Sequence, residues 1–377
     1  MKKLSLIFIL LWLATSAGGV DLKAVVPGGS GQPQSADGQI KLIDFQGEAP
    51  AGKATEGSTT LIIGGAALLG AAGPAPEVEG WVPLAIKRQG KDLEISWNND
   101  LYPAPRLFAL DSATAGDYQN NYDDSKWSLV AANGALVAGV TGYSYSPGKL
   151  VHQNQVGTGT AAMYYKGIQA GASPAAYFSQ AGAVGKINVT VGLDWNMVSP
   201  TVFANSLNKT LGTDFIAGDE LYNWDNSSQQ ALSKVAVFDG TAWQLVNSAS
   251  WNNLANGVGY GLNILNLPSG QTTRTITLVG NVRPDNFAAV INKDWNKIGA
   301  PFPHYTTLNG NSGFTAGVSQ SGDEFWMWDL ASKGLTRVSK FNGSVWTPEF
   351  VLRPGVGYGY NYMGKETEPL PWQINKQ

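Results

Sequence analysis

Two pairs of adjacent carboxylates stand at equivalent places in the second half of the chain, Asp219-Glu220 and Asp323-Glu324. Glycoside hydrolysis needs two acids roughly 5 to 10 Å apart around the scissile bond. Adjacent residues of a strand point to opposite faces of a sheet, so neither pair supplies that geometry alone. We expect both pairs to form turns that enter strands, and a hydrolase would have to combine acids from separate modules.

Histidine and cysteine chemistry is scarce in this sequence. The chain has two histidines, His152 and His304, and no cysteine, which excludes thiol nucleophiles, disulfides and thiolate zinc sites. Either histidine could be a ligand, but their separation in the sequence favours neutral side chains at the surface or in hydrogen bonds. The chain has no Gly-x-Ser-x-Gly nucleophile elbow. The sequence therefore predicts no catalytic residue, no metal site and no cofactor.

One acidic segment, Asp117 to Asp124, has enough side-chain oxygens to hold calcium. It lacks the ordered spacing and the glycine of an EF-hand loop. A solvated loop is favoured, and calcium binding is left open.

Four aromatic residues occur with a spacing of two in equivalent segments: Tyr222, Trp224, Trp326 and Trp328. In a strand this spacing places each pair on one face, while Leu221 and Phe325 point the other way. Large aromatic residues at equivalent positions of repeats favour packing inside a module. The alternative is a rigid platform of flat rings on which sugar rings stack.

The second half of the chain is a tandem duplication. Four blocks recur in the same order with offsets of 98 to 104 residues: Asp194-Trp195-Asn196 with Asp294-Trp295-Asn296, Gly218-Asp219-Glu220 with Gly322-Asp323-Glu324, Phe238-Asp239-Gly240 with Phe341-Asn342-Gly343, and Gly257 to Gly261 with Gly355 to Gly359. Such self-similarity is typical of repeated structural modules.

The blocks also predict local structure. Asp239-Gly240 and Asn342-Gly343 predict tight hairpins, since both residue types tolerate positive φ. The two Gly-Val-Gly-Tyr-Gly blocks predict strands whose glycines leave room for a ring or a neighbouring backbone, and we expect aromatic side chains to cover them.

The chain divides into five predicted regions. Residues 1–19 have the charged start, short apolar run and small residues of a secretory signal peptide, and residues 20–75 form a leader rich in Gly, Ala, Ser and Pro. Residues 76–183 form a β module, residues 184–282 are repeat 1, and residues 283–377 are repeat 2. In the β module, Trp97 comes early and Tyr164-Tyr165 late, a pattern that suggests a sandwich of fibronectin type III or immunoglobulin kind.

Composition favours an all-β fold of tandem sandwich-like modules. The chain of 377 residues has 46 Gly and 19 Pro, a turn density that suits short strands. Charged residues make up 14%, and the formal net charge is −3 without a stripe of Lys and Arg. Nucleic acid is therefore not an expected partner.

The repeats resemble those of many secreted and cell-surface bacterial proteins, which begin with a G-W-N-L-I-S-x-P type strand, pass through a W-D block and end in a G-x-G-Y-W strand. The matching segments are Asp194 to Pro200, Trp224-Asp225 and Gly257 to Tyr260, and again from Asp294 onward. Lys297 to Pro301 departs from the first strand of the pattern, and Gly261 and Gly359 stand where Trp often follows Tyr. The resemblance implies extracellular β modules without established catalysis.

These observations favour an exported, non-enzymatic protein for cell-surface structure, adhesion or matrix attachment. The alternative is a carbohydrate-binding protein that docks polysaccharide on Tyr222, Trp224, Trp326 and Trp328. The expected partners are a cell-surface polysaccharide or a matrix protein, and the edge strands leave self-association open.

Overall fold

The computed structural model divides the chain into two compact units, Met1–Val78 and Glu79–Gln377. In the second unit the structure describes residues 80–111, 126–157, 162–177, 181–224, 232–246, 254–255, 257–283, 286–310, 312–315, 317–364 and 370–374. In the first unit it describes two strand pairs, β1 (Ile7–Leu10) with β2 (Lys41–Asp44) and β3 (Gly52–Glu56) with β4 (Thr59–Ile63). The remainder of the predicted signal peptide and leader, and the segment Asp117 to Asp124, lie outside the described residues.

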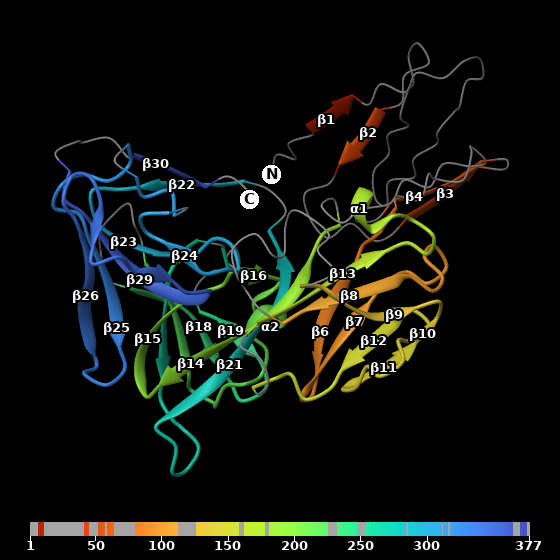
Figure 1. Ribbon diagram of the computed structural model, residues 1–377, viewed down its shortest axis with the longest axis horizontal. Coiled ribbons are helices and arrows are strands. Elements are labelled where there is room, and N and C mark those ends of the chain that lie inside the picture. The colour runs from red at the N-terminus through yellow and green to blue at the C-terminus, as the bar shows by residue number, and fades with distance from the viewer. Residues whose placement is uncertain are drawn as a thin grey trace, which may run out of the picture. The chain divides into compact units, whose positions relative to one another are not determined.

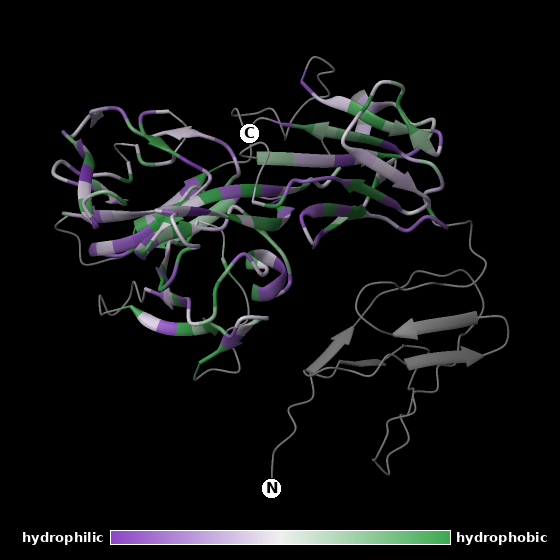
Figure 2. Ribbon diagram, turned by 90° about the horizontal axis from the view of Figure 1, so that it is seen from below, coloured by the Kyte–Doolittle hydropathy of each residue, from purple (hydrophilic) through white to green (hydrophobic). Residues whose placement is uncertain are grey.

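Antiparallel sheets make up almost all of the regular structure, which confirms the all-β prediction. The helices among the described residues are short, α1 (Pro174–Tyr177) and α2 (Leu207–Leu211). Hydrophilic and hydrophobic residues alternate along many strands, as expected where one face of a sheet covers a core (Figure 2).

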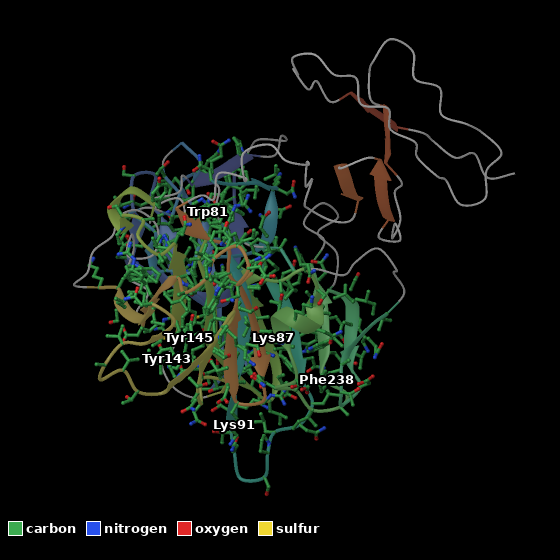
Figure 3. All side chains as sticks on the ribbon, turned by 90° about the vertical axis from the view of Figure 1, so that its right-hand side faces the viewer. Trp81, Lys87, Lys91, Tyr143, Tyr145 and Phe238 are labelled. Carbon is green, nitrogen blue, oxygen red and sulfur yellow. The ribbon has the colours of Figure 1, made fainter. Side chains whose placement is uncertain are left out.

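The strands between residues 81 and 168 form what we call the sandwich module. They are β5 (Trp81–Val82), β6 (Ala85–Gln89), β7 (Asp92–Ser96), β8 (Arg106–Leu110), β9 (Ser128–Ala132), β10 (Ala135–Leu136), β11 (Tyr143–Ser146), β12 (Lys149–His152) and β13 (Ala162–Ile168). One sheet has the order β11-β12-β7-β6, and β10, β9, β8 and β13 belong to the other. Buried residues of both sheets, among them Leu93, Leu107, Leu150 and Tyr165, share one core. Figure 3 draws the side chains on the ribbon, with Trp81 of β5, Lys87 of β6, and Tyr143 and Tyr145 of β11 labelled.

The long strand β14 (Val184–Gly192) connects the sandwich module to repeat 1. It pairs with β13 on one edge and with β21 (Thr273–Val282) on the other, and β16 (Val202–Phe203) follows β21 in the same sheet. β14 and β21 run side by side through the middle of the second unit (Figure 1). The equivalent strands of repeat 2, β22 (Phe287–Ile291) and β30 (Leu370–Ile374), pair in the same way.

The two repeats have the same topology, in agreement with the tandem duplication. Repeat 1 pairs its strands in the order β15 (Asp194–Ser199), β20 (Tyr260–Ile264), β17 (Glu220–Asn223), β18 (Ser233–Phe238) and β19 (Trp243–Leu245). Repeat 2 has the corresponding order β23 (Asp294–Gly299), β29 (Gly355–Tyr362), β25 (Glu324–Asp329), β26 (Gly334–Phe341) and β27 (Trp346–Thr347). A separate pair in repeat 2 joins β24 (Thr306–Thr307) to β28 (Val351–Leu352).

The repeats join in one ten-stranded sheet through reciprocal contacts. Val198 of repeat 1 lies opposite Val356 of repeat 2, and the equivalent residues, Ile298 of repeat 2 and Val258 of repeat 1, form a bridge as well. Reciprocal contacts between equivalent residues define a two-fold relation, like that of a symmetric dimer. The repeats are therefore related by an internal pseudo-two-fold axis, and β19 and β27 are the outer strands of the shared sheet.

Glycines make this junction possible. A Cβ atom on Gly259 would lie 2.9 Å from the carbonyl oxygen of Ile298, and one on Gly357 would lie 2.9 Å from that of Val198. Any side chain at either position would push the two backbones apart. The first part of the glycine prediction, room for a neighbouring backbone, is confirmed.

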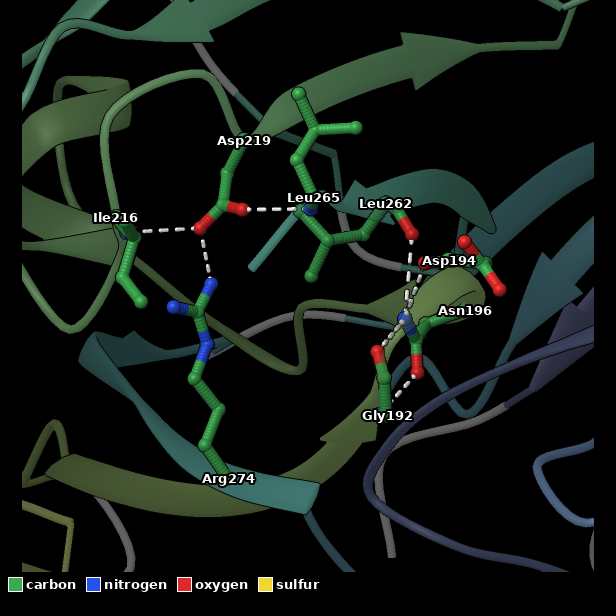
Figure 4. Close-up of polar contacts among 8 residues, drawn as sticks. All are labelled: Gly192, Asp194, Asn196, Ile216, Asp219, Leu262, Leu265 and Arg274. Carbon is green, nitrogen blue, oxygen red and sulfur yellow. Dashed lines mark hydrogen bonds and ion pairs between the residues drawn. The ribbon is translucent and has the colours of Figure 1, made fainter. Parts of the chain in front are cut away.

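The Asp-Trp-Asn blocks recur because they build a turn. Asp194 and Asp294 have φ values of 69° and 66°, and the buried Asn two residues later holds the turn together. The amide of Asn196 accepts the N–H of Gly192 (2.8 Å) and donates to the carbonyl oxygens of Gly192 and Asp194 (2.9 Å each), as Figure 4 shows. Asn296 makes the same contacts in repeat 2.

The hairpins at Asp239 and Asn342 form as predicted, but the role assigned to these two residues was wrong. Gly240 and Gly343 have positive φ values of 102° and 100°, whereas Asp239 and Asn342 do not have positive φ. The Asp239 carboxylate instead accepts the N–H groups two and three residues ahead, both at 2.8 Å, and Asn342 does the same at 2.9 and 3.0 Å. The side chain therefore replaces a backbone acceptor in the turn.

Candidate functional site

Six half-buried aromatic rings lie on the outer face of the ten-stranded sheet, away from the core. We call this set the aromatic face: Trp195, Tyr222, Trp224, Trp295, Trp326 and Trp328. Leu221 and Phe325, which alternate with these rings, are fully buried in the core. The predicted alternation is thus confirmed. The interpretation that we favoured for the four rings, packing inside a module, is wrong, because they lie outside the buried core, on the opposite side of the sheet. Their binding role stays a prediction.

Two of the rings cover glycines, as we expected. A Cβ atom on Gly261 would lie 3.2 Å from the ring of Trp195, and one on Gly359 would lie 3.0 Å from the ring of Trp295. Each indole therefore rests directly on a bare stretch of backbone, which fixes its position on the sheet.

The rings form equivalent pairs in the two repeats. The centroids of Trp195 and Tyr222 are 4.9 Å apart with an interplanar angle of 57°, and those of Trp295 and Trp326 are 5.8 Å apart with the same angle. These separations fall in the range where aromatic pairs attract each other. Each repeat thus presents a rigid and partly exposed pair of rings.

Aromatic residues of the two repeats approach each other where the repeats join. The indole N–H of Trp224 in repeat 1 donates to the carbonyl oxygen of Trp295 in repeat 2 (3.2 Å). The ammonium of Lys297 lies 5.4 Å from the centroid of Trp224 and 5.2 Å from that of Trp295, within cation–π range of both. Burial lowers the pKa of Lys297 to about 8.

The second acid of each pair borders the aromatic face and is already engaged. Glu220 accepts the hydroxyl of Tyr222 (2.7 Å) and the amide of Asn263 (3.1 Å) and forms an ion pair with Lys234. Burial alone raises the pKa of Glu220, but the hydrogen bonds from Lys234, Tyr222 and Asn263 outweigh it, so the net shift is downward. A carboxylate held in its ionised form suits binding better than proton donation.

Glu324 occupies the equivalent place in repeat 2. It pairs with Arg337 at 2.7 Å and with Lys340 at 3.6 Å. Both bordering glutamates therefore contact cations from the neighbouring strand of their own repeat.

The first acid of each pair is a buried structural residue, consistent with a turn at the start of the strand. Asp219 accepts the N–H groups of Ile216 (2.8 Å) and Leu265 (3.0 Å) and forms an ion pair with Arg274 (Figure 4).

Asp323 occupies the place of Asp219 in repeat 2. It accepts the N–H groups of Gln320 and Met363 (2.8 Å each) and the hydroxyl of Tyr360 (2.5 Å). Burial raises the pKa of Asp323 and outweighs these hydrogen bonds.

The two histidines are buried in different places. His152 stacks on Tyr143 at 3.9 Å, and its Nδ1 lies 2.6 Å from the hydroxyl of Tyr165. His304 stacks on Phe302 at 6.0 Å. Burial lowers the pKa of each histidine to about 4, so both are neutral at pH 7, and their burial excludes the surface location that we considered.

Among the described residues, no group of three or more His, Cys, Asp or Glu side chains gathers in a way that could hold a metal ion. The segment considered for calcium, Asp117 to Asp124, lies outside those residues.

The sequence did not indicate two of the six rings of the aromatic face, nor the lysine between the repeats. Trp195 and Trp295 were treated as repeat markers, although the period of two in Asp-Trp-Asn already separates the Trp from the buried Asn. Lys297 was noted as a departure from the repeat pattern. Its position between two indoles could not be predicted, because it depends on how the repeats join.

Comparison with protein-family models, curated proteins and solved structures gives no match for this chain. In the part of the chain that the structure describes, no helix is long and apolar enough to cross a membrane.

Proposed function

We propose that the chain is an exported, non-enzymatic protein that attaches a cell surface to polysaccharide through the aromatic face. The observation that supports this proposal best is the gathering of six half-buried rings, from equivalent strands of two repeats, on one face of a sheet. Flat rings fixed on a sheet suit the apolar faces of pyranose sugars, and rings that are held in advance lose little entropy on binding.

The chemistry around the rings supports binding rather than turnover. Glu220 and Glu324 are paired with cations, and Asp219 and Asp323 are enclosed in structural hydrogen bonds. Asn263 and the two glutamates supply polar groups beside the rings, where sugar hydroxyls need partners.

Export is supported by the sequence of residues 1–19. If it occurs, the mature protein begins after a cleavage near Ala17, and the mass of the protein recovered from outside the cytoplasm measures this directly. A mature protein that retains Met1 to Ala17 and stays in the cytoplasm would contradict export.

Cosedimentation with insoluble polysaccharides tests the binding. Trp224→Ala and Trp326→Ala are each expected to weaken binding several-fold, since a stacked ring contributes about 0.5–1.5 kcal/mol beyond its buried area. Tyr305→Ala is the matched control, because Tyr305 is 47% exposed and lies outside the aromatic face. Equal binding by all three variants, or no binding by the unmodified protein to any polysaccharide of a broad panel, would refute the proposal.

A further inference from the structure

Lys297 lies at the centre of the aromatic face, on the seam between the repeats. It is half-buried and alternates on β23 with the core residues Asn296 and Ile298, so its side chain belongs to the outer face. Its ammonium is within cation–π distance of one indole from each repeat, Trp224 and Trp295.

Lys297 has no lysine counterpart across the pseudo-two-fold axis. The residue of repeat 1 that corresponds to Lys297 is Met197, which is also half-buried on the outer face of its strand. Each repeat supplies three rings and a bordering glutamate from equivalent strands, with Trp326 in the place of Tyr222, but the central ammonium comes from repeat 2 alone. At this one position the difference between the repeats is a charge, since methionine and lysine are both long, unbranched side chains.

Three of the acids that border the face contact cations. Glu220 pairs with Lys234, Glu324 pairs with Arg337 and Lys340, and Asp194 of repeat 1 pairs with Lys333 of repeat 2. Lys297 adds positive charge at the middle of this surface. A ligand that brings negative charge to the seam is complementary to it.

A uronic acid unit has a group for each of the two features of the face, its rings and its ammonium. Such a sugar has an apolar ring face for stacking and a carboxylate at the ring edge. The carboxylate forms a charge-assisted hydrogen bond with a lysine ammonium, which is strengthened where rings exclude water.

We propose that the aromatic face binds an anionic polysaccharide and that Lys297 selects it by pairing with the carboxylates of its uronic acid units. This inference rests on the proposed polysaccharide binding and names the class of ligand.

The test compares two forms of one polymer, polygalacturonate and its methyl ester, which differ in the charge of the carboxyl groups. The unmodified protein is expected to bind polygalacturonate about fivefold more tightly than its methyl ester, which corresponds to the upper range for one ion pair at a protein surface. Lys297→Met, which installs the residue of repeat 1, is expected to bind both polymers equally, and Lys297→Arg is expected to keep the preference. Tyr305→Ala serves again as the control.

Each outcome decides a different point. A preference that survives in Lys297→Met overturns the role of Lys297, and equal binding of both polymers by the unmodified protein overturns the anionic ligand class while the proposed function stands. Binding to neither polymer, nor to any other polysaccharide, overturns the proposed function itself.

If Lys297→Met does not fold, salt provides the second measurement. The preference of the unmodified protein for polygalacturonate should disappear as NaCl is raised from about 0.05 to 0.5 M, because the shorter Debye length screens the attraction between Lys297 and the carboxylates. A preference that does not change with salt overturns the inference.

Discussion

Replacing Asp219 by asparagine tests whether the buried acids stabilise the fold, and whether the size of that stabilisation depends on the partner of each acid. Asp219 is fully buried, and its ion-pair partner Arg274 is 7% exposed. Asparagine keeps the shape of the side chain but leaves the guanidinium without its countercharge. Breaking a buried ion pair from one side costs about 3–5 kcal/mol, so Asp219→Asn should destabilise the protein by about that amount.

The equivalent residue in repeat 2 provides the matched control. Asp323 has a phenol, that of Tyr360, in place of a guanidinium, so Asp323→Asn leaves no charge behind. Its cost should stay near that of one or two weakened hydrogen bonds, about 1–2 kcal/mol. Urea unfolding at pH 7, followed by circular dichroism, measures both variants.

A double-mutant cycle separates the ion pair from the turn. Arg274→Met in the Asp219→Asn background removes the stranded charge and should recover a large part of the loss. Equal costs for Asp219→Asn and Asp323→Asn, or additive effects of Asp219→Asn and Arg274→Met, would refute this account of the two acids.

The pKa of Asp323 gives the same comparison a pH dependence. Because burial raises the pKa of Asp323 in the folded state above its ordinary value, the contribution of this acid is fully present below pH 3.8 and is lost as the pH rises through the raised pKa. Asp323→Asn should therefore cost less at pH 7 than at pH 4. A cost that is the same at the two pH values would contradict the shift.

Three further predictions follow from contacts elsewhere in the fold. Arg88 of the sandwich module donates to the carbonyl oxygens of Thr210 and Leu211 at the end of α2, so Arg88→Ala should cost about 2–3 kcal/mol in urea unfolding. Gly212→Ala, whose Cβ would overlap the guanidinium of Arg88, should cost less in the Arg88→Ala background than alone. Burial lowers the pKa of His152 and His304 from 6.5 to about 4, so the stability that each contributes is present above pH 6.5 and is lost as the pH falls toward 4; His304→Gln should reduce the drop in urea midpoint between pH 7 and pH 4.5, and an unchanged drop would contradict it. Asn208 hydrogen-bonds to both the backbone N–H and the carbonyl of Trp243, and Asn309 does the same with Trp346, so alanine at either position should cost about 1–3 kcal/mol of unfolding free energy. A loss below about 0.5 kcal/mol, the usual range for surface substitutions, would show that these hydrogen bonds do not stabilise the fold.

Local pattern was enough to predict the parts of the fold that depend on neighbouring residues. The period of two separated Leu221 from Tyr222 and Phe325 from Trp326, because alternation along a strand is a property of the backbone. The glycines of the two Gly-Val-Gly-Tyr-Gly blocks indicated close packing, because a residue without a side chain lets a ring or a backbone approach the strand. The role of Asp239 was mispredicted, since a side-chain hydrogen bond in the turn competes with the positive φ that its residue type also allows.

Contacts between distant segments could not be predicted in the same way. Asp219 and Arg274 are separated by more than fifty residues, and repeat 2 has a tyrosine partner in another strand, so equivalence between the repeats did not indicate the ion pair. The position of Lys297 between Trp224 and Trp295 follows from the pseudo-two-fold axis, which the duplicated blocks do not determine. Two tandem modules with the same sequences could also have remained separate.

The pseudo-two-fold junction explains why a face of this size forms at all. One repeat alone offers a strand end at Val198 and a strand start at Val258, each with unpaired backbone groups that need partners. Joining the end of one repeat to the start of the other satisfies both edges at once, and the glycines at 259 and 357 let the backbones come close enough for it. The same approach brings Trp224 of repeat 1 over the backbone of Trp295 in repeat 2. Duplication thus produces a continuous set of rings, and the change from methionine at position 197 to lysine at position 297 places an ammonium beside two of these rings at the seam.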